Sequence, residues 1–434
     1  MKLKFIFRSI LAVAVVAMAS CKPEFKDITP SAGTANFSRY IAVGNSLTSG
    51  YADGGLYLEG QQNSYPEMIS AQMKTVGGGA FSTPFFNANQ ADGSGYLVLK
   101  SFTAAGAPVT AIQSTNSAIR AQTAVPGVGT VNFLTKYTGE LNNYGVPGIK
   151  LALVNFGSYG NLNPFFERLL PGSFPANTNT TYMDFVTAKP WTFFSMWLGN
   201  NDVLGFATTG GASAADAPTP KATFTALYTD AATRLTANGA AKGVVATIPD
   251  VLATPFFRTV TLATLLTAVR ASAPTINNIY IQPGAGPVRA ATAEDYFLLT
   301  LSSAGLVGTQ TIPYGLDPRN PVENKYVLDK AEAATVTDFT NAYNTTIKSV
   351  AAAKGLAVVD AYALLREYGA GKMVNGAGVS AAFITGNLFS LDGIHLTPLG
   401  YSIVANEFIR SINSKYGSNI PIVDVTKYRG VKFP

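Results

Sequence analysis

Cysteine and histidine are almost absent from this sequence of 434 residues, which contains one of each. With Cys21 as the only cysteine, no intrachain disulfide is possible. A zinc site is also not expected, because zinc in proteins is bound mainly by cysteine and histidine. The sequence has no loop motif typical of calcium sites either. We therefore expect no metal ion and no other cofactor.

Charged residues are also scarce, at 13% of the chain, and the net charge is +6. No run of lysine or arginine occurs after the first eight residues, so the electrostatic pattern of a nucleic-acid-binding protein is missing. Hydrophobic residues make up 47% of the sequence, which excludes a disordered chain and predicts a large core. We expect a globular protein that does not bind nucleic acid.

Long apolar runs are missing too, and the run at residues 10–18 is too short to span a membrane. Basic residues precede this run, and Ala19, Ser20 and Cys21 follow it. The pattern predicts a bacterial lipoprotein signal peptide over residues 1–20, with lipid attached to Cys21 and a polar tether over 21–37. The other interpretation is an ordinary secretory signal with a chance cysteine. A lipid-anchored chain is expected in the cell envelope, at the outer membrane, on a side that the sequence leaves open.

Predicted strands alternate with predicted helices along the rest of the chain. Apolar runs that end in turns predict buried strands at 39–43, 192–198, 242–248 and 356–359. Helical spacing of apolar residues predicts helices at 64–76, 218–237, 329–354 and 398–415. This order is typical of an α/β fold, a three-layer α/β/α sandwich around a mostly parallel sheet.

We expect one domain over residues 38–434 that carries two insertions. The first, at about 77–135, is rich in glycine, serine, threonine and asparagine and is expected to be irregular, with short strands near 96–99. The second, at about 251–327, has no clear periodicity and has the length to pack as a small subdomain.

The single histidine, His395, lies three residues after Asp392 and just before the last predicted helix. A carboxylate at this spacing can accept the imidazole Nδ1–H and orient the ring for proton transfer. The alternative is a solvent-exposed histidine beside an aspartate that caps the helix. A second candidate is Ser46, in the turn after the first strand, where a serine is exposed at the carboxyl edge of a parallel sheet. By itself this turn favours a structural role, since many turns contain the same pattern.

Two further loops follow predicted strands or lie between them. Residues 143–148 form a glycine-rich turn that can present a backbone N–H, and residues 199–202 (GNND) offer an amide side chain. With the serine and histidine segments, these loops resemble, in order, the four blocks of the SGNH (GDSL-type) lipase and acylhydrolase family. The resemblance covers residues 38–76, 139–250 and 328–415 and implies the SGNH hydrolase fold.

The resemblance also implies the roles of individual residues. Ser46 is the expected nucleophile, with Asp392 and His395 completing the triad. Ser46, Gly148 and Asn201 are the expected donors to the oxyanion. The family usually has aspartate at the position of Asn45, and we interpret this difference as a variant that keeps the nucleophile.

The activity implied is hydrolysis of a carboxylic ester through an acyl-enzyme on Ser46. Candidate substrates are small-molecule, lipid or acylated-glycan esters, because the same residues also remove acetyl groups from carbohydrates. A third interpretation is a non-catalytic, lipid-anchored binding protein on the same scaffold. The acyl chain length, the alcohol and the oligomeric state are left open by the sequence.

Overall fold

A parallel sheet of five strands organises the polypeptide. In the computed structural model, which describes residues 29–434 except 105, 126–128, 178 and 306, the strand order is β13-β8-β7-β1-β6. The strands are β1 Tyr40–Gly44, β6 Asn143–Gly145, β7 Phe193–Trp197, β8 Lys242–Ala246 and β13 Ala357–Val359. All neighbouring pairs are parallel, so the carboxyl ends of the strands meet at one edge.

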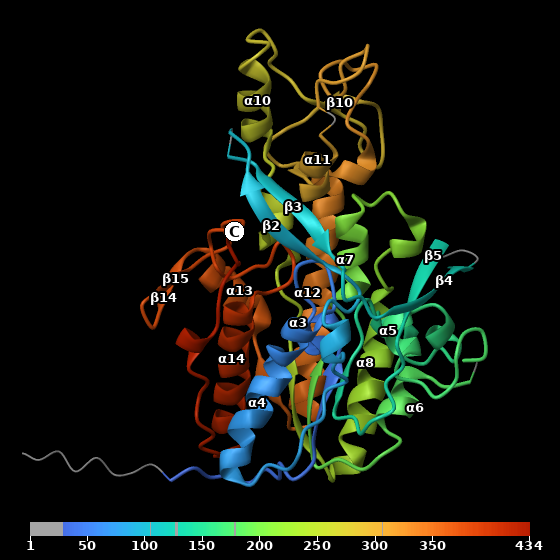
Figure 1. Ribbon diagram of the computed structural model, residues 1–434, viewed down its shortest axis with the longest axis vertical. Helices are drawn as coiled ribbons and strands as arrows, with labels where there is room; N and C mark the ends of the chain where they lie inside the picture. Colours follow the sequence, from blue (N-terminus) through green and yellow to red (C-terminus); the bar gives the residue numbers. More distant parts are fainter. Residues whose placement is uncertain (1–28, 105, 126–128, 178, 306) are drawn as a thin grey trace, which may run out of the picture. The chain divides into compact units, whose positions relative to one another are not determined.

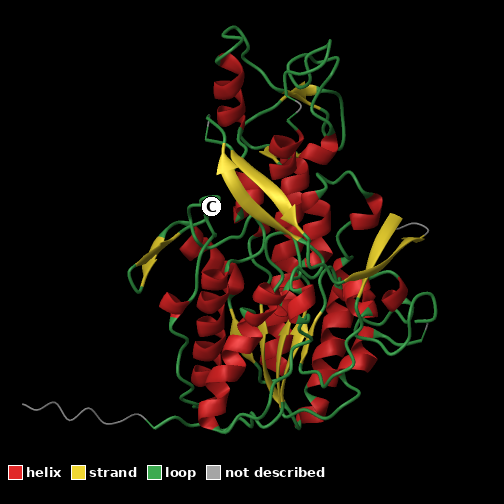
Figure 2. Cartoon of the chain, in the orientation of Figure 1, coloured by secondary structure: helices red, strands yellow, loops and turns green. Residues whose placement is uncertain are grey.

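Side chains of the sheet alternate between two hydrophobic clusters, as the period of a strand requires. In β1, Ile41 and Val43 pack on one face, and Tyr40 and Ala42 pack on the other. The first face is covered by α7 Asn201–Thr208, α8 Lys221–Leu235 and α12 Lys330–Ala353. The second is covered by α4 Tyr65–Met73, α13 Ala361–Gly369 and α14 Pro398–Tyr416 (Figures 1 and 2). The predicted three-layer α/β/α architecture is confirmed.

Local capping explains where the two longest helices begin. Asp329 accepts the N–H groups of Ala331 and Glu332, and the Glu332 carboxylate accepts the Asp329 N–H, which forms a capping box at the start of α12. Thr397 caps α14 by accepting the Gly400 N–H, and Pro398 occupies the first turn. The four predicted strands and four predicted helices all occur, with ends that differ by a few residues.

The first insertion is more regular than expected. It contains two antiparallel hairpins, β2 Tyr96–Phe102 with β3 Pro108–Gln113, and β4 Ile119–Val125 with β5 Gly129–Leu134. Most of these side chains are exposed or half-buried, so the strands do not need the apolar alternation by which a strand is recognised. The glycine-rich segment at 143–148 also differs from the expected turn, because its first three residues form edge strand β6.

The second insertion has a small hydrophobic cluster of its own. Its elements are the helices α9 Pro255–Arg258, α10 Leu262–Arg270 and α11 Leu299–Ala304, with the short strand pairs β9 Tyr280–Ile281/β10 Arg289–Ala290 and β11 Tyr296–Phe297/β12 Val327–Leu328. The cluster includes Ile279, Ile281, Phe297 and Val322, all fully buried. Short helices α2 Ser46–Ser49, α3 Leu58–Gln62, α5 Pro164–Glu167 and α6 Tyr182–Val186, and hairpin β14 Lys372–Val374/β15 Ala377–Val379, complete the fold.

Within the described residues, no helix has the length and hydrophobicity needed to cross a membrane. The expected signal peptide, Cys21 and the first part of the tether, up to residue 28, lie outside the described residues.

Candidate active site

Ser46 lies in a tight turn at the carboxyl edge of the sheet, directly after β1. Gly44 ends the strand, and a Cβ at this position would lie 2.0 Å from Thr48 Oγ1, so only glycine fits. Asn45 then begins helix α2, with its Oδ1 accepting the Leu47 N–H at 3.1 Å. This turn places the Ser46 hydroxyl at the wall of a cavity.

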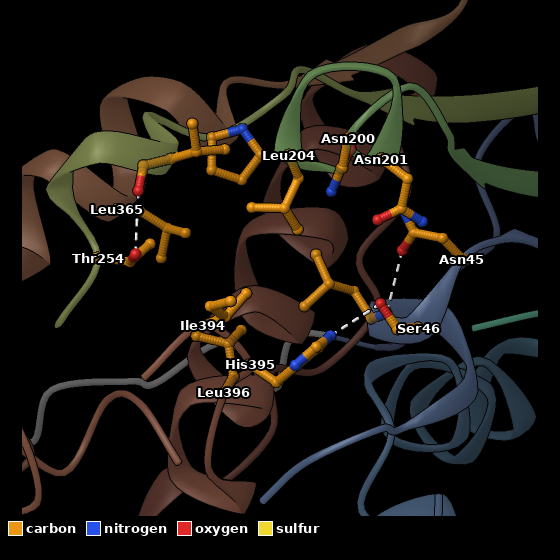
Figure 3. A pocket seen from close by; sticks show the side chains of 13 residues that line it. Asn45, Ser46, Asn200, Asn201, Leu204, Thr254, Leu365, Ile394, His395 and Leu396 are labelled. Carbon is orange, nitrogen blue, oxygen red and sulfur yellow. Dashed lines mark hydrogen bonds between the residues drawn. The ribbon is translucent and has the colours of Figure 1, made fainter. Parts of the chain in front are cut away.

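His395 reaches Ser46 across 349 residues of sequence. Its Nε2 lies 2.8 Å from Ser46 Oγ, and its Nδ1 lies 2.8 Å from Asp392 Oδ2 (Figure 3). When Nδ1–H donates to the carboxylate, Nε2 is free to accept the serine proton. Such an arrangement can serve as a nucleophile, a base and an orienting carboxylate.

The Asp392 carboxylate is held from several sides. Its Oδ1 accepts the backbone N–H groups of Ile394 at 2.9 Å and His395 at 2.8 Å, and its Oδ2 accepts the Gly54 N–H at 2.9 Å. Ser390 Oγ donates a longer bond of 3.3 Å to Oδ1. Burial alone would raise the pKa of Asp392, but the attraction of the His395 imidazole and these hydrogen bonds hold the pKa well below its usual range. Asp392 is thus kept ionised and fixed in direction.

A second aspartate, Asp53, was not singled out by the sequence. It links the loop after Ser46 to the loop that carries Asp392 and His395. Asp53 Oδ1 accepts the Leu391 N–H at 2.9 Å, and the Asp53 N–H donates to Ser390 Oγ at 2.9 Å. Tyr57 donates to Asp53 Oδ2 at 2.7 Å, and the Asp53 carbonyl accepts the Leu97 N–H at 2.7 Å. Asp53 has a φ of 53° and is buried, and burial raises its pKa. An Asp-Gly pair such as 53–54 is typical of a turn, but nothing local indicates its distant partner.

Tyr51 is another residue that contacts the site and that the sequence did not reveal. Its ring lies against the His395 imidazole, with ring centroids 4.7 Å apart. Its hydroxyl donates to the Gly54 carbonyl at 2.6 Å, and its carbonyl accepts the Tyr401 hydroxyl at 2.6 Å. The aromatic ring therefore restricts the imidazole from a side that Asp392 does not touch.

The expected oxyanion donors follow three neighbouring strands, β1, β6 and β7, at the same edge of the sheet. Gly148 follows β6, which pairs with β1 through Gly44 and Gly145, and has a φ of 80°. Within the described part of the chain, neither the Gly148 N–H nor the Ser46 N–H has a hydrogen-bond partner. Both backbone groups are therefore available as donors.

Asn201 connects its own loop with that of Gly148. One N–H of its side-chain amide donates to the Ile149 carbonyl at 2.9 Å, which leaves the second N–H available. The next residue, Asp202, is buried and accepts the N–H groups of Leu151 at 2.6 Å and Ala152 at 3.1 Å. These contacts hold the start of α7 against the segment that follows β6.

The cavity beside Ser46 is mostly apolar and has a volume of about 470 Å³, part of it open to solvent. Its polar lining comes from Asn45, Ser46, Asn200, Asn201, Thr254 and His395, and its apolar lining from Leu47, Leu204, Pro249, Val251, Leu365, Ile394 and Leu396. Figure 3 shows the asparagines gathered near Ser46 and the apolar side chains extending away from it. Gly148 is not among the lining residues. The sequence revealed none of the apolar lining, since these residues look like ordinary core positions.

The residues described by the structure include no group of three or more histidine, cysteine, aspartate or glutamate side chains arranged to hold a metal ion.

Comparison with known proteins identifies the class. The model of the GDSL-like lipase/acylhydrolase family matches residues 40–408. The chain belongs to this family, as the resemblance of its four segments predicted.

Among solved structures, the matches have low sequence identity. One is LAE5, described as an alpha/beta hydrolase enzyme from the metagenome of Lake Arreo, Spain, with 11% identity, a TM-score of 0.36, and coverage of 87% of this chain and 96% of that one. Another is a putative SGNH hydrolase from Slackia heliotrinireducens, with 12% identity, a TM-score of 0.31, and coverage of 87% and 100%. No curated protein matches the sequence.

Proposed function

We propose that this chain hydrolyses carboxylic esters through a covalent acyl-enzyme on Ser46. Membership of the GDSL-like family supports hydrolase activity in general. The observation that carries the finer proposal is the continuous relay from Ser46 Oγ through both nitrogens of His395 to Asp392, with two contacts of 2.8 Å. The other described carboxylates and hydroxyls lack such a link, because the chain has only one histidine.

In the first half-reaction, Ser46 Oγ attacks the ester carbonyl while His395 Nε2 takes the hydroxyl proton. The carbonyl oxygen becomes an oxyanion that accepts hydrogen bonds from the backbone N–H groups of Ser46 and Gly148 and from the free N–H of Asn201. The C–O bond to the alcohol then breaks, and His395 gives its proton to the departing alkoxide.

In the second half-reaction, water replaces the alcohol. His395 takes a proton from the water as its oxygen attacks the acyl carbon, and the same donors bind the second oxyanion. The bond to Ser46 Oγ breaks, the serine recovers its proton from His395, and the carboxylic acid leaves. Asp392 stabilises the imidazolium in both halves without taking the proton.

The apolar side chains around Ser46 support an acyl group as the part of the substrate that enters the cavity. Leu204, Val251 and Ile394 line it, and none of them can hydrogen-bond a sugar hydroxyl. A pocket of this composition binds hydrocarbon by removing apolar surface from water.

A fluorophosphonate probe tests the proposal, because it reacts covalently with an activated serine hydroxyl. We expect labelling of the wild type, loss of labelling in Ser46→Ala, and hydrolysis of p-nitrophenyl acetate or butyrate only by proteins that label. Ser70→Ala is the matched control, since it removes another buried serine hydroxyl, in α4. A wild type that does not label, or a Ser46→Ala variant that labels normally, contradicts the proposal.

We also propose that Cys21 carries a lipid that anchors the chain in a bacterial cell envelope. The basic residues, the short apolar run and Ala19-Ser20-Cys21 support this proposal. Metabolic labelling with a fatty-acid analogue tests it. We expect label and membrane association in the wild type, and neither in Cys21→Ala. Label that persists in Cys21→Ala contradicts it.

A further inference from the structure

The side chain of Asn45 has one amide atom with a partner and one without. Its exposed fraction is 1%, and its Oδ1 accepts the Leu47 N–H at 3.1 Å. Its Nδ2 is buried and, among the described residues, has no hydrogen-bond partner. The residue lines the cavity together with Ser46, Asn200 and Asn201 (Figure 3).

The orientation of this amide follows from its contacts. The Leu47 N–H is a donor, so the amide atom facing it must be the oxygen, and Nδ2 must be the atom without a partner. Rotating the amide would place two donors against each other and remove the cap of α2. A buried donor without a partner is destabilising, so a group that accepts its hydrogen bond is expected in the working enzyme.

The reaction itself supplies such a group. In the proposed chemistry, Ser46 Oγ bonds to the acyl carbon and the carbonyl oxygen on that carbon becomes an anion. Ser46 is next in sequence to Asn45. Asn200 also lines the cavity and has a buried Oδ1 without a described partner, but Asn45 is the residue whose amide orientation is fixed by the Leu47 N–H and which lies next to Ser46 in the chain.

We propose that Asn45 Nδ2 donates a hydrogen bond to this oxyanion, as a donor additional to Ser46, Gly148 and Asn201. The inference rests on the proposed function. An aspartate at position 45 would place an acceptor, charged when ionised, at this point. The asparagine supplies a donor and removes that charge, which favours the transition state over the neutral substrate.

The test is Asn45→Asp, which keeps the size of the side chain and the oxygen that caps α2 but removes the donor. We expect kcat for p-nitrophenyl butyrate to fall about 100-fold at about pH 8, with KM nearly unchanged. As the pH falls toward the carboxyl range, the protonated acid regains an O–H donor, so the ratio of variant to wild-type kcat rises.

Asn36→Asp is the matched control. Asn36 makes the same local contact, with Oδ1 accepting the Ser38 N–H at 3.0 Å, but it is exposed and does not line the cavity. Its kcat is expected to equal that of the wild type. Asn45→Ser is a second test variant, because its hydroxyl can still cap α2; we expect a similar loss of kcat with no recovery at low pH.

The outcomes separate this inference from the proposed function. If the wild type labels and turns over while Asn45→Asp and Asn45→Ser keep kcat within about twofold at every pH, the additional donor is refuted and the esterase remains. A rise in KM with unchanged kcat refutes it as well, since that pattern means binding of the ground state. A wild type that neither labels nor turns over refutes the proposed function, and the inference with it.

Discussion

Asp53 accepts the backbone N–H of Leu391 at 2.9 Å and so joins two loops that are 338 residues apart in the chain. The neighbouring Gly54 N–H donates to Asp392 Oδ2 at 2.9 Å. The loop that follows Ser46 therefore also holds the Asp392 carboxylate, which in turn contacts His395. The first insertion contributes to this arrangement, because Leu97 of β2 donates its N–H to the Asp53 carbonyl at 2.7 Å.

Asp53→Ala is expected to lower kcat about 100-fold, because small displacements of positioned groups cost rate on this scale. Asn at this position can still accept the Leu391 N–H, so Asp53→Asn should recover most of the activity. The measurement is kcat and KM of both variants over a range of pH. Asp53 is a positioning residue by this argument, so an Asp53→Ala enzyme with the kcat and pH profile of the wild type would contradict it.

Asn201→Asp is expected to lower kcat by about 10²–10³, because it removes a proposed donor to the oxyanion while keeping the side-chain size. The KM should change little, since the neutral ester carbonyl makes a weaker bond to the same donor. Steady-state kinetics with p-nitrophenyl butyrate give both values. The melting temperature serves as a control for the lost bond to the Ile149 carbonyl, and an equal fall in activity and folded fraction would exclude a role in catalysis.

The sheet and its main helices could be predicted because their signals are local. Runs such as Tyr40–Gly44 and Phe193–Trp197 are fully buried on both faces, and α12 carries its own capping box. The family's four segments could be recognised for the same reason. Strand β6 was missed because three residues at a sheet edge carry too little pattern to be distinguished from a glycine-rich turn.

The supporting contacts of the site could not be predicted, because each depends on chain that is distant in sequence. Asp53 pairs with Leu391, and Tyr51 packs on His395. The sequence around one residue of each pair gives no indication of the other. The apolar lining of the cavity has the composition of ordinary core. The unpaired Nδ2 of Asn45 is visible only when its whole surroundings are known.

Leu204→Phe is expected to change which esters are hydrolysed. Leu204 lines the cavity beside Ser46, and a larger ring there reduces the space for an acyl chain. A difference of one or two methylenes in an apolar pocket is worth about 1–3 kcal/mol, so the ratio of kcat/KM for p-nitrophenyl octanoate to that for acetate should fall roughly tenfold or more. The acetate rate itself serves as the internal control. A ratio equal to that of the wild type would place the acyl chain elsewhere.

Glu332→Gln is expected to change how the stability of the fold depends on pH. Burial, together with the adjacent Asp329, raises the pKa of Glu332 from its usual 4.5 to about 7. Because the folded-state pKa lies above the unfolded value, the wild type has the full contribution of the protonated carboxyl below about pH 4.5 and loses it as the pH rises through 7.

Glutamine at position 332 keeps an oxygen that can accept the Asp329 N–H in the capping box, but it does not ionise. One pKa unit corresponds to about 1.4 kcal/mol, and solvent around the half-buried carboxyl reduces the effect, so we expect Glu332→Gln to gain about 1 kcal/mol over the wild type between about pH 5 and pH 8. Denaturant unfolding of both proteins at the two pH values measures this difference. A difference in unfolding free energy that stays constant with pH would mean that Glu332 titrates in the folded chain as it does in the unfolded one.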